Sequence, residues 1–332
     1  MTARLSILDQ SPVSEGSTGA DALLRSVDLA RHADALGYTR YWVAEHHGTP
    51  MLACASPEIL VAEIAAATTR IRVGSGGVML PHYSPLKVAE TFSILSGMHP
   101  GRIDLGIGRA AGTDPVTAFA LQRDRQHAIA DDFHQQLTEL LAFLYNRVPP
   151  QHSFAKLGNL PGRPGHPEPW LLGSSPQSGI WAAEAGLPYA FADIISPAGG
   201  PVTKRYREQF TPSDVSRTSY VMTAVAAICA ETDAAAQRLA SSARMAFTLF
   251  LQGMPGKVPP VDTAERFFAE RPGALEAVGA HRRFIVGSPA TVRRGIDAVR
   301  QEYGADEMMI VTITHDHAAR RRSYELIAEA YR

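Results

Sequence analysis

Four segments of the chain carry residues whose types and spacing could do chemistry. The first contains two adjacent histidines, His46 and His47, in Ala44-Glu45-His46-His47-Gly48. Neighbouring side chains of a strand point to opposite sides, so one of the two would face a site and the other would pack away from it. A histidine titrates near neutral pH, which suits proton transfer. A structural histidine with satisfied hydrogen bonds explains the pair equally well.

The second and third segments are rich in glycine. Val73–Pro81 contains Ser75, Gly76 and Gly77, which indicates either a turn or bulge or a close approach of the backbone to a flat ligand. Leu105–Gly112 has the spacing GxGxxxG, and no helical pattern follows it immediately, so it does not match a dinucleotide fingerprint. An arginine that leaves a glycine-lined strand end suits an anionic group, and Arg109 has this position.

The fourth segment is a serine turn, Gly173-Ser174-Ser175-Pro176-Gln177-Ser178. Pro176 occupies a predicted first helical position. The free N–H groups of a helix start, together with hydroxyl groups, form an anion cradle. Capping accounts for one serine but not for three, so this turn predicts phosphate binding.

Two other kinds of chemistry find little support. Thr314–His317 and the His46-His47 pair offer possible metal ligands, but neither shows an HExxH or facial-triad pattern. No metal site is predicted. The chain also lacks the GxSxG elbow of a serine hydrolase.

The elements that must position these segments alternate between strands and helices. Helices are predicted over Ala20–Leu36 (ended by Gly37), Pro57–Ala67, Leu86–Leu95, Ala128–Leu144 and Gln177–Ala185. Strands are predicted over Leu5–Leu8, Arg40–Ala44, Ile71–Ser75, Arg102–Ile107, Pro169–Leu172, Leu187–Ala192, Tyr220–Ala230 and Glu307–Ile313. Such alternation implies parallel βαβ units, in an open sheet or a closed barrel. The strand count and the length favour a (β/α)8 TIM barrel, whose chemistry lies at the strand ends where the four segments fall.

The chain shows no linker that would divide it, so residues 1–332 are expected to form one domain. Two stretches rich in proline or glycine, residues 149–169 and 252–280, are predicted as irregular loops at the barrel mouth. Long loops of this kind often act as lids over a site.

Composition narrows the function further. The 332 residues are 45% hydrophobic with a formal net charge of -1, which argues against a nucleic-acid or membrane surface. Arg320-Arg321-Arg322 is interpreted as the solvated face of a C-terminal helix. Two distant cysteines predict no disulfide, and no apolar run approaches the roughly 18 residues of a membrane span. Without a secretory pattern at the N-terminus, the expected location is cytoplasmic.

Several blocks, in this order, resemble the bacterial luciferase-like flavin monooxygenases. They are Ala44–His47, Arg70–Pro81, Gly101–Arg109, Trp181–Pro188 and Phe284–Pro289. The resemblance covers nearly the whole chain and is strongest to the single-chain group, some members of which serve in antibiotic biosynthesis.

The resemblance implies a set of site residues. His46 matches the family's active-site histidine, which assists formation or breakdown of the flavin–oxygen adduct. Ser75, Gly76 and Gly77 match a bulge against the isoalloxazine, and the Gly76–Gly77 peptide would be cis. Arg109, Ser175 and Ser178 match positions that hold the flavin phosphate, in a turn that also includes Gly173 and Ser174. Gly108 stands where luciferase itself has a reactive cysteine, so light emission is not expected.

The expected activity is oxygenation of a small organic substrate by O2 and reduced FMN (FMNH2). No second nucleotide-binding unit is visible, so a separate flavin reductase would supply the cofactor. Two alternatives remain open: an F420-dependent dehydrogenase or reductase on the same barrel, and a non-catalytic flavin-binding protein. The resemblance also implies a homodimer formed through early barrel helices, and the segments Pro57–Ala67 and Leu86–Leu95, which are rich in Ala, Ile and Leu, fit this expectation.

Overall fold

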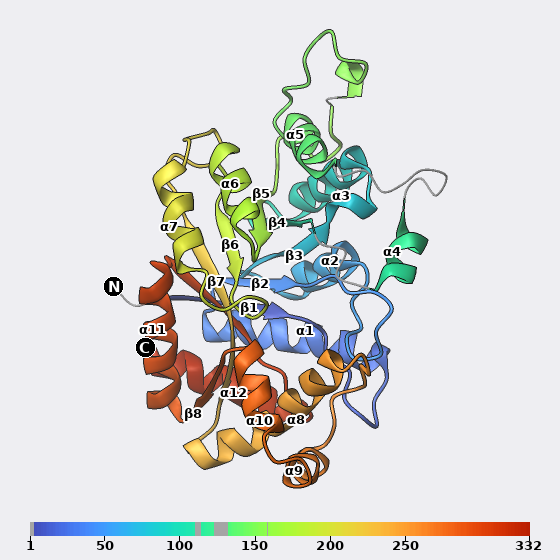
Figure 1. Cartoon of the computed structure of the whole chain (residues 1–332). Helices are drawn as coiled ribbons and strands as arrows, with labels where there is room; N and C mark the ends of the chain where they lie inside the picture. The colour runs from blue at the N-terminus through green and yellow to red at the C-terminus, as the bar shows by residue number, and fades with distance from the viewer. Residues whose placement is uncertain (1–2, 110–113, 123–131, 158) are drawn as a thin grey trace.

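The strands form one parallel sheet that closes on itself (Figure 1). The computed structural model describes residues 3–109, 114–122, 132–157 and 159–332. Within these residues eight strands follow one another around a barrel, from β1 to β7 and then β9, which pairs with β1 again. They are β1 (Arg4–Asp9), β2 (Arg40–Val43), β3 (Arg72–Met79), β4 (Ile103–Gly108), β5 (Glu168–Gly173), β6 (Tyr189–Ala192), β7 (Val221–Cys229) and β9 (Glu307–Val311). The predicted TIM barrel is therefore confirmed.

A further short strand, β8 (Phe284–Gly287), was not predicted as a strand. The first half of the long strand β7 pairs with β9 over Met222–Ala226, and its second half pairs with β8 over Ala226–Cys229. β8 thus extends the sheet beside the carboxyl end of β7. This places the chain just before β8 near the mouth of the barrel.

Helices surround the barrel (Figure 1). They are α1 (Gly19–Leu36), α2 (Pro57–Ala67), α3 (Pro85–Met98), α4 (Pro115–Leu121), α5 (Phe133–Leu144), α6 (Pro176–Glu184), α7 (Gly200–Gln209), α8 (Asp233–Leu251), α9 (Val261–Ala269), α10 (Ala274–His281), α11 (Pro289–Tyr303) and α12 (His317–Ala330). The five predicted helices correspond to α1, α2, α3, α5 and α6, and Gly37 ends α1 in the left-handed conformation as expected. The start of the predicted helix Ala128–Leu144 lies outside the described residues, as do Ala110, Ala111 and Gly112.

The prediction of an irregular stretch over residues 252–280 was wrong in part, because α9 and α10 both lie within it. The prediction relied on the prolines of this stretch as signs of a loop. Pro260, however, occupies the N-cap position of α9, where the missing N–H costs no hydrogen bond. Both helices pack against α8 (Figure 1). The other predicted loop, residues 149–169, contains the single 3-10 turn Ala155–Leu157 before β5 begins.

Alternation along the strands divides the core into two layers. On β2, Tyr41 and Val43 belong to the apolar layer between barrel and helices, whereas Trp42 and Ala44 belong to the layer inside the barrel. Inside, the Trp42 and Trp170 rings meet edge to face, with centroids 5.3 Å apart. These large, buried side chains help to fill the interior of the barrel.

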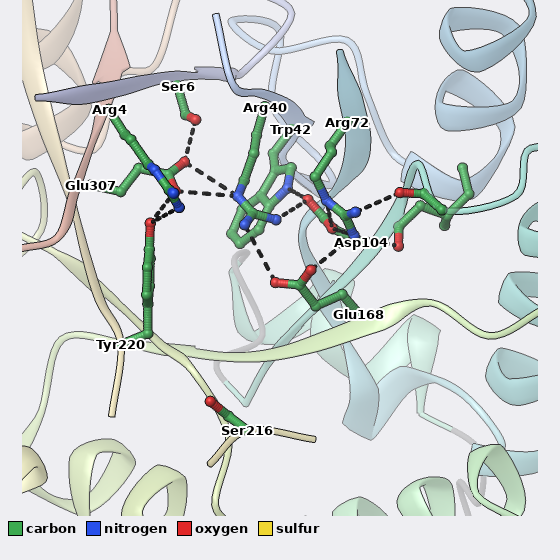
Figure 2. A network of polar contacts seen from close by, with 12 residues as sticks. Arg4, Ser6, Arg40, Trp42, Arg72, Asp104, Glu168, Ser216, Tyr220 and Glu307 are labelled. Atoms are coloured by element: carbon green, nitrogen blue, oxygen red, sulfur yellow. Dashed lines mark hydrogen bonds and ion pairs between the residues drawn. The ribbon is translucent and has the colours of Figure 1, made fainter. Parts of the chain in front are cut away.

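Charged residues at the strand starts close the opposite end of the barrel (Figure 2). The Arg40 guanidinium lies 2.9 Å from Asp104, 3.3 Å from Glu168 and 3.2 Å from Glu307. Arg72 lies beside the same Asp104 and, at 3.0 Å, beside Glu168. We call these five residues the basal network; its buried charges are paired and hydrogen-bonded, as stability requires.

The interpretation of Arg320-Arg321-Arg322 as a solvated face was wrong for Arg320. That side chain is buried, donates from Nε to Thr312 O at 2.8 Å, and lies 2.6 Å from Asp9. Arg321 is partly buried and Arg322 is exposed. The error has a physical reason: the partner, Asp9, is 311 residues away in sequence, at the end of β1.

Candidate active site

Two adjoining cavities open at the carboxyl ends of the strands. Their volumes are about 300 Å³ and 830 Å³, both within the usual range for ligand sites. Gln10, His46, Ile194 and Ile195 line both cavities and so form the wall between them. We call the smaller one the flavin-side cavity, after the ligand predicted for it from the sequence, and the larger one the outer cavity.

The flavin-side cavity brings together almost all the residues predicted from the sequence. It is lined by His46, Gly76, Gly77, Arg109, Gly173, Ser174, Ser175 and Ser178. Ser75 is the exception: its side chain is fully buried and donates to Gly106 O at 2.9 Å, which ties β3 to β4. The role of each residue toward a cofactor stays a prediction.

The glycine-rich wall is a bulge in β3. The register between β3 and β4 shifts between Ser75 and Val78, and the Gly76–Gly77 peptide is cis, as predicted. A Cβ at Gly77 would lie 2.7 Å from Gly106 O, and one at Gly76 would lie 2.5 Å from Leu8 Cδ1. At Gly77 a side chain would collide with backbone, and at Gly76 it would require Leu8 to shift, so glycine at both positions leaves bare backbone in the cavity wall.

The serine turn starts α6 as expected, with Ser175 at the N-cap and Pro176 in the first helical position. The Ser175 hydroxyl accepts from the Ser178 N–H. The Ser178 hydroxyl is engaged by the protein itself: it donates to Ser175 O at 2.7 Å and lies 2.8 Å from the Tyr189 hydroxyl. Capping thus explains two of the three serines, and Ser174 together with the free N–H groups of the helix start remains for an anion.

Arg109 follows β4 on the same side of the cavity. Its guanidinium lies over the Trp181 ring, 5.4 Å from the ring centroid. Trp181 in turn contacts Phe133, with ring centroids 5.2 Å apart. This stacking holds the arginine near the start of α6, so that two sources of positive potential converge on one end of the cavity.

His46 and Gln10 are the polar residues among the four that form the wall between the cavities, and His46 is the titratable one. Its backbone N–H donates to Cys54 O at 2.9 Å, and its Nδ1 is buried without a hydrogen-bond partner among the described residues. Burial, together with the nearby His47 and Arg282, lowers the pKa of His46 to about 4. The imidazole is therefore neutral at pH 7, with a ring nitrogen able to accept a proton or share one with a ligand.

His47 has a different environment. Its Nε2 lies 2.9 Å from Glu45 Oε1, and its ring meets His82 edge to face. Glu45 Oε2 accepts from the Met79 N–H at 3.0 Å. The pair therefore fixes the end of β2 to the end of β3, although His47 also reaches the outer cavity.

Some lining residues were not identified from the sequence. Gln10 directly follows β1, and the rule that barrel chemistry lies after strand ends could have found it. Ile194 and Ile195 follow β6 in the same way. Arg282 lines the outer cavity but follows a helix, so no strand-end rule points to it.

The described residues show neither a metal-binding cluster nor a membrane-spanning helix. No group of three or more His, Cys, Asp or Glu side chains there could hold a metal ion. No helix in that part of the chain is both long enough and apolar enough to cross a membrane.

A parallel barrel with paired cavities at its mouth is the architecture of a TIM-barrel enzyme. The model of the luciferase-like monooxygenase family matches residues 3–307. The chain is 39% identical to the luciferase-like monooxygenase of Escherichia coli K12, covering 98% of this chain and 96% of that one. It is 34% identical to the N-acetyl-S-alkylcysteine monooxygenase of Bacillus subtilis, covering 98% of each. The chain belongs to the luciferase-like monooxygenase family.

A solved structure supports the same family assignment. The crystal structure of apo-MsnO8 has a TM-score of 0.90 and 41% identity, covering 99% of this chain and 98% of that one. Two more distant structures share the fold alone. They are the oxygenating constituent of 3,6-diketocamphane monooxygenase in complex with FMN (TM-score 0.71, 21% identity) and an F420-dependent secondary alcohol dehydrogenase (TM-score 0.68, 12% identity); the chain aligns with 97% and 100% of them.

Proposed function

We propose that this protein is a monooxygenase that uses reduced FMN, delivered by a separate flavin reductase, and O2 to oxygenate a small organic substrate. The observation that carries the proposal is the place of His46. A neutral histidine whose buried Nδ1 has no hydrogen-bond partner in the described part of the chain lies in the wall shared by two cavities, one suited to a flavin and one to a substrate.

The flavin-side cavity fits FMN. The bare backbone of Gly76 and Gly77 offers a flat wall for a ring system, and a Cβ at either position would meet neighbouring atoms. At the far end of the same lining, Arg109 and the start of α6 suit a phosphate. Gly76, Gly77, Arg109, Gly173, Ser174, Ser175 and Ser178 would hold the cofactor, with Ser75 supporting the bulge from behind.

When bound, the reduced flavin supplies the electrons that activate oxygen. The chain's own residues position it, exclude water and manage protons. His46 is uncharged at neutral pH, so its unprotonated ring nitrogen would accept a hydrogen bond, and transiently a proton, from the reacting centre. The apolar lining of both cavities keeps bulk water away from that exchange.

The alternative cofactor is F420, since F420-dependent enzymes share this fold. Anaerobic titration with reduced FMN and with reduced F420, followed by mixing with oxygenated buffer, separates the candidates. We expect reduced FMN to bind more tightly and to react with oxygen on a time course unlike that of free flavin. Preference for F420 without a reaction with oxygen would identify a dehydrogenase. Binding of FMN that leaves its reaction with oxygen unchanged would identify a non-catalytic flavin-binding protein.

A further inference from the structure

The outer cavity is lined mainly by apolar side chains. They come from α8, from β8 and from the ends of β7 and β9, and include Ile228, Phe247, Phe250, Phe284, Val311 and Ile313. Such a lining favours an apolar, ring-containing or branched ligand. Arg282 is the one arginine or lysine among the described residues that line this cavity.

Arg282 lies between α10 and β8 and is partly buried in the wall of this cavity. Its guanidinium carbon lies 3.8 Å from the centroid of the Phe247 ring, and its Nε donates to Ile194 O at 2.8 Å. These two contacts fix the plane of the guanidinium. Among the described residues, no hydrogen bond engages the two terminal nitrogens, which can therefore donate to a ligand.

The charge of Arg282 is not neutralised by the described residues. Its neighbour Arg283 pairs with Glu302 at 2.7 Å, whereas burial lowers the pKa of Arg282 to about 10. Among the described residues that line the cavity, Asp114 is the sole carboxylate, and it accepts from the Val116 and Thr117 N–H groups at the start of α4. A desolvated cation without a counter-ion costs free energy. An anionic ligand that pairs with it removes part of this cost and therefore binds more tightly.

We propose that Arg282 binds an acidic oxygen group, such as a carboxylate, of an otherwise apolar organic substrate. The inference rests on the proposed function in treating the outer cavity as the substrate site, and it names the substrate class: an apolar organic acid. Its anion would take two donors of the guanidinium side by side, and its apolar body would pack against the aromatic lining. Arg282 would thus determine specificity rather than take part in the chemistry.

Two dyes of similar shape test the charge requirement. 8-Anilinonaphthalene-1-sulfonate carries an anionic group, and N-phenyl-1-naphthylamine is its neutral counterpart. We expect Arg282→Met, which keeps the length but removes the charge, to weaken binding of the anionic dye by about 10- to 100-fold, the scale of a lost hydrogen bond to a charged group. Binding of the neutral dye should be unchanged or tighter. Arg282→Lys should recover part of the loss.

Arg271→Met is the matched control. Arg271 also stacks on a phenylalanine, with its guanidinium carbon 4.3 Å from the Phe267 ring centroid, but its side chain is 51% exposed and does not line the cavity. Both dyes should bind this variant as they bind the unmodified protein. The proposal would be overturned if Arg282→Met lost equal affinity for both dyes, or if its affinity for the anionic dye were unchanged.

The test does not depend on the cofactor. Circular dichroism verifies that Arg282→Met is folded, and FMN titration of the same variant should be unaffected because Arg282 does not line the flavin-side cavity. If the protein failed to bind reduced FMN at all, the proposed function would fall. The contrast between the two dyes would still report whether Arg282 binds anions.

Discussion

At the scale of single residues, the two adjacent histidines show how environment separates identical side chains. His46 lies in the wall between two cavities with its Nδ1 unpartnered among the described residues, and His47 lies 2.9 Å from a buried carboxylate. Spacing alone could predict that the two point in different directions. It could not predict which one reaches the flavin-side cavity, because that depends on Glu45 and on β3.

Replacing His46 with Ala should lower turnover by roughly 10²–10⁴-fold, the range typical of lost general acid–base catalysis. Folding and FMN affinity should be largely retained, since the side chain contributes mainly to reactive states. Steady-state oxygen consumption with reduced FMN, at equal flavin occupancy, measures the effect. His47→Ala is the control: it should lower the melting temperature with less effect on turnover. If His47→Ala lost turnover while His46→Ala stayed active, His47 would be the catalytic histidine and His46 the structural one.

The lowered pKa of His46 also predicts a pH dependence of stability. The folded-state pKa is about 4, below the ordinary value of about 6.5. As the pH falls through this window the unfolded chain takes up a proton that the folded chain does not, so the free energy of unfolding decreases. Urea unfolding at several pH values should show a smaller decrease for His46→Gln. Parallel curves for both proteins would contradict a buried neutral His46.

At the scale of elements, β4 and α6 bring together the end of the cavity predicted to bind phosphate. Replacing Arg109 with Ala should weaken FMN binding by about 1.5–3 kcal/mol, the usual contribution of a hydrogen bond to a charged group. Riboflavin lacks the phosphate, so its affinity for the protein should change little in Arg109→Ala. Fluorescence titration with both ligands provides the comparison, and equal losses would place Arg109 elsewhere than at the phosphate.

The sequence predicted the barrel strands well because they are buried on both faces and form continuous apolar runs. The prediction was poorer for elements whose structure depends on contacts with residues far away in the sequence. The four residues of β8 form a strand by pairing with the second half of β7, and α9 follows two prolines that suggested a loop. Arg282 could not be identified as a site residue because Ile194 and Phe247, which hold it, are far away in sequence.

At the scale of the whole molecule, the basal network stabilises the end of the barrel opposite the cavities. Asp104 is fully buried and accepts from Arg40 at 2.9 Å, from Trp42 Nε1 at 2.8 Å and from Arg72 Nε at 2.8 Å. Asp104→Asn removes the negative charge that Arg40 and Arg72 share. We expect this substitution to lower the free energy of unfolding by about 3–5 kcal/mol.

Chemical denaturation measures this loss. Glu168→Gln is the comparison, since its side chain is 36% exposed and touches the same two arginines. Solvent screens that pair, so the cost should stay within about 1 kcal/mol. Equal costs at both positions would mean that burial does not set the strength of the network.

Assembly is predicted at the same scale. Ile59 on α2 and Ile94 and Met98 on α3 are 69%, 45% and 68% exposed, which supports the proposed homodimer through these early helices. Sedimentation at micromolar concentration should show a dimer, and Met98→Glu should dissociate it. Leu24→Glu on α1, where the leucine is 70% exposed, should leave the dimer intact. A protein that sediments as a monomer before any substitution would refute the proposal.

The basal network has a consequence for laboratory evolution. Its arginines and carboxylates come from the first residues of the strands, whereas both cavities are lined by the last residues and the segments that follow them. A library randomised over Phe247, Phe250, Leu251, His281 and Arg282, which line the outer cavity, would therefore leave the charged base of the barrel untouched. Most of its members should keep the fold while differing in the compounds they accept, so selection could act on substrate range with little loss to misfolding.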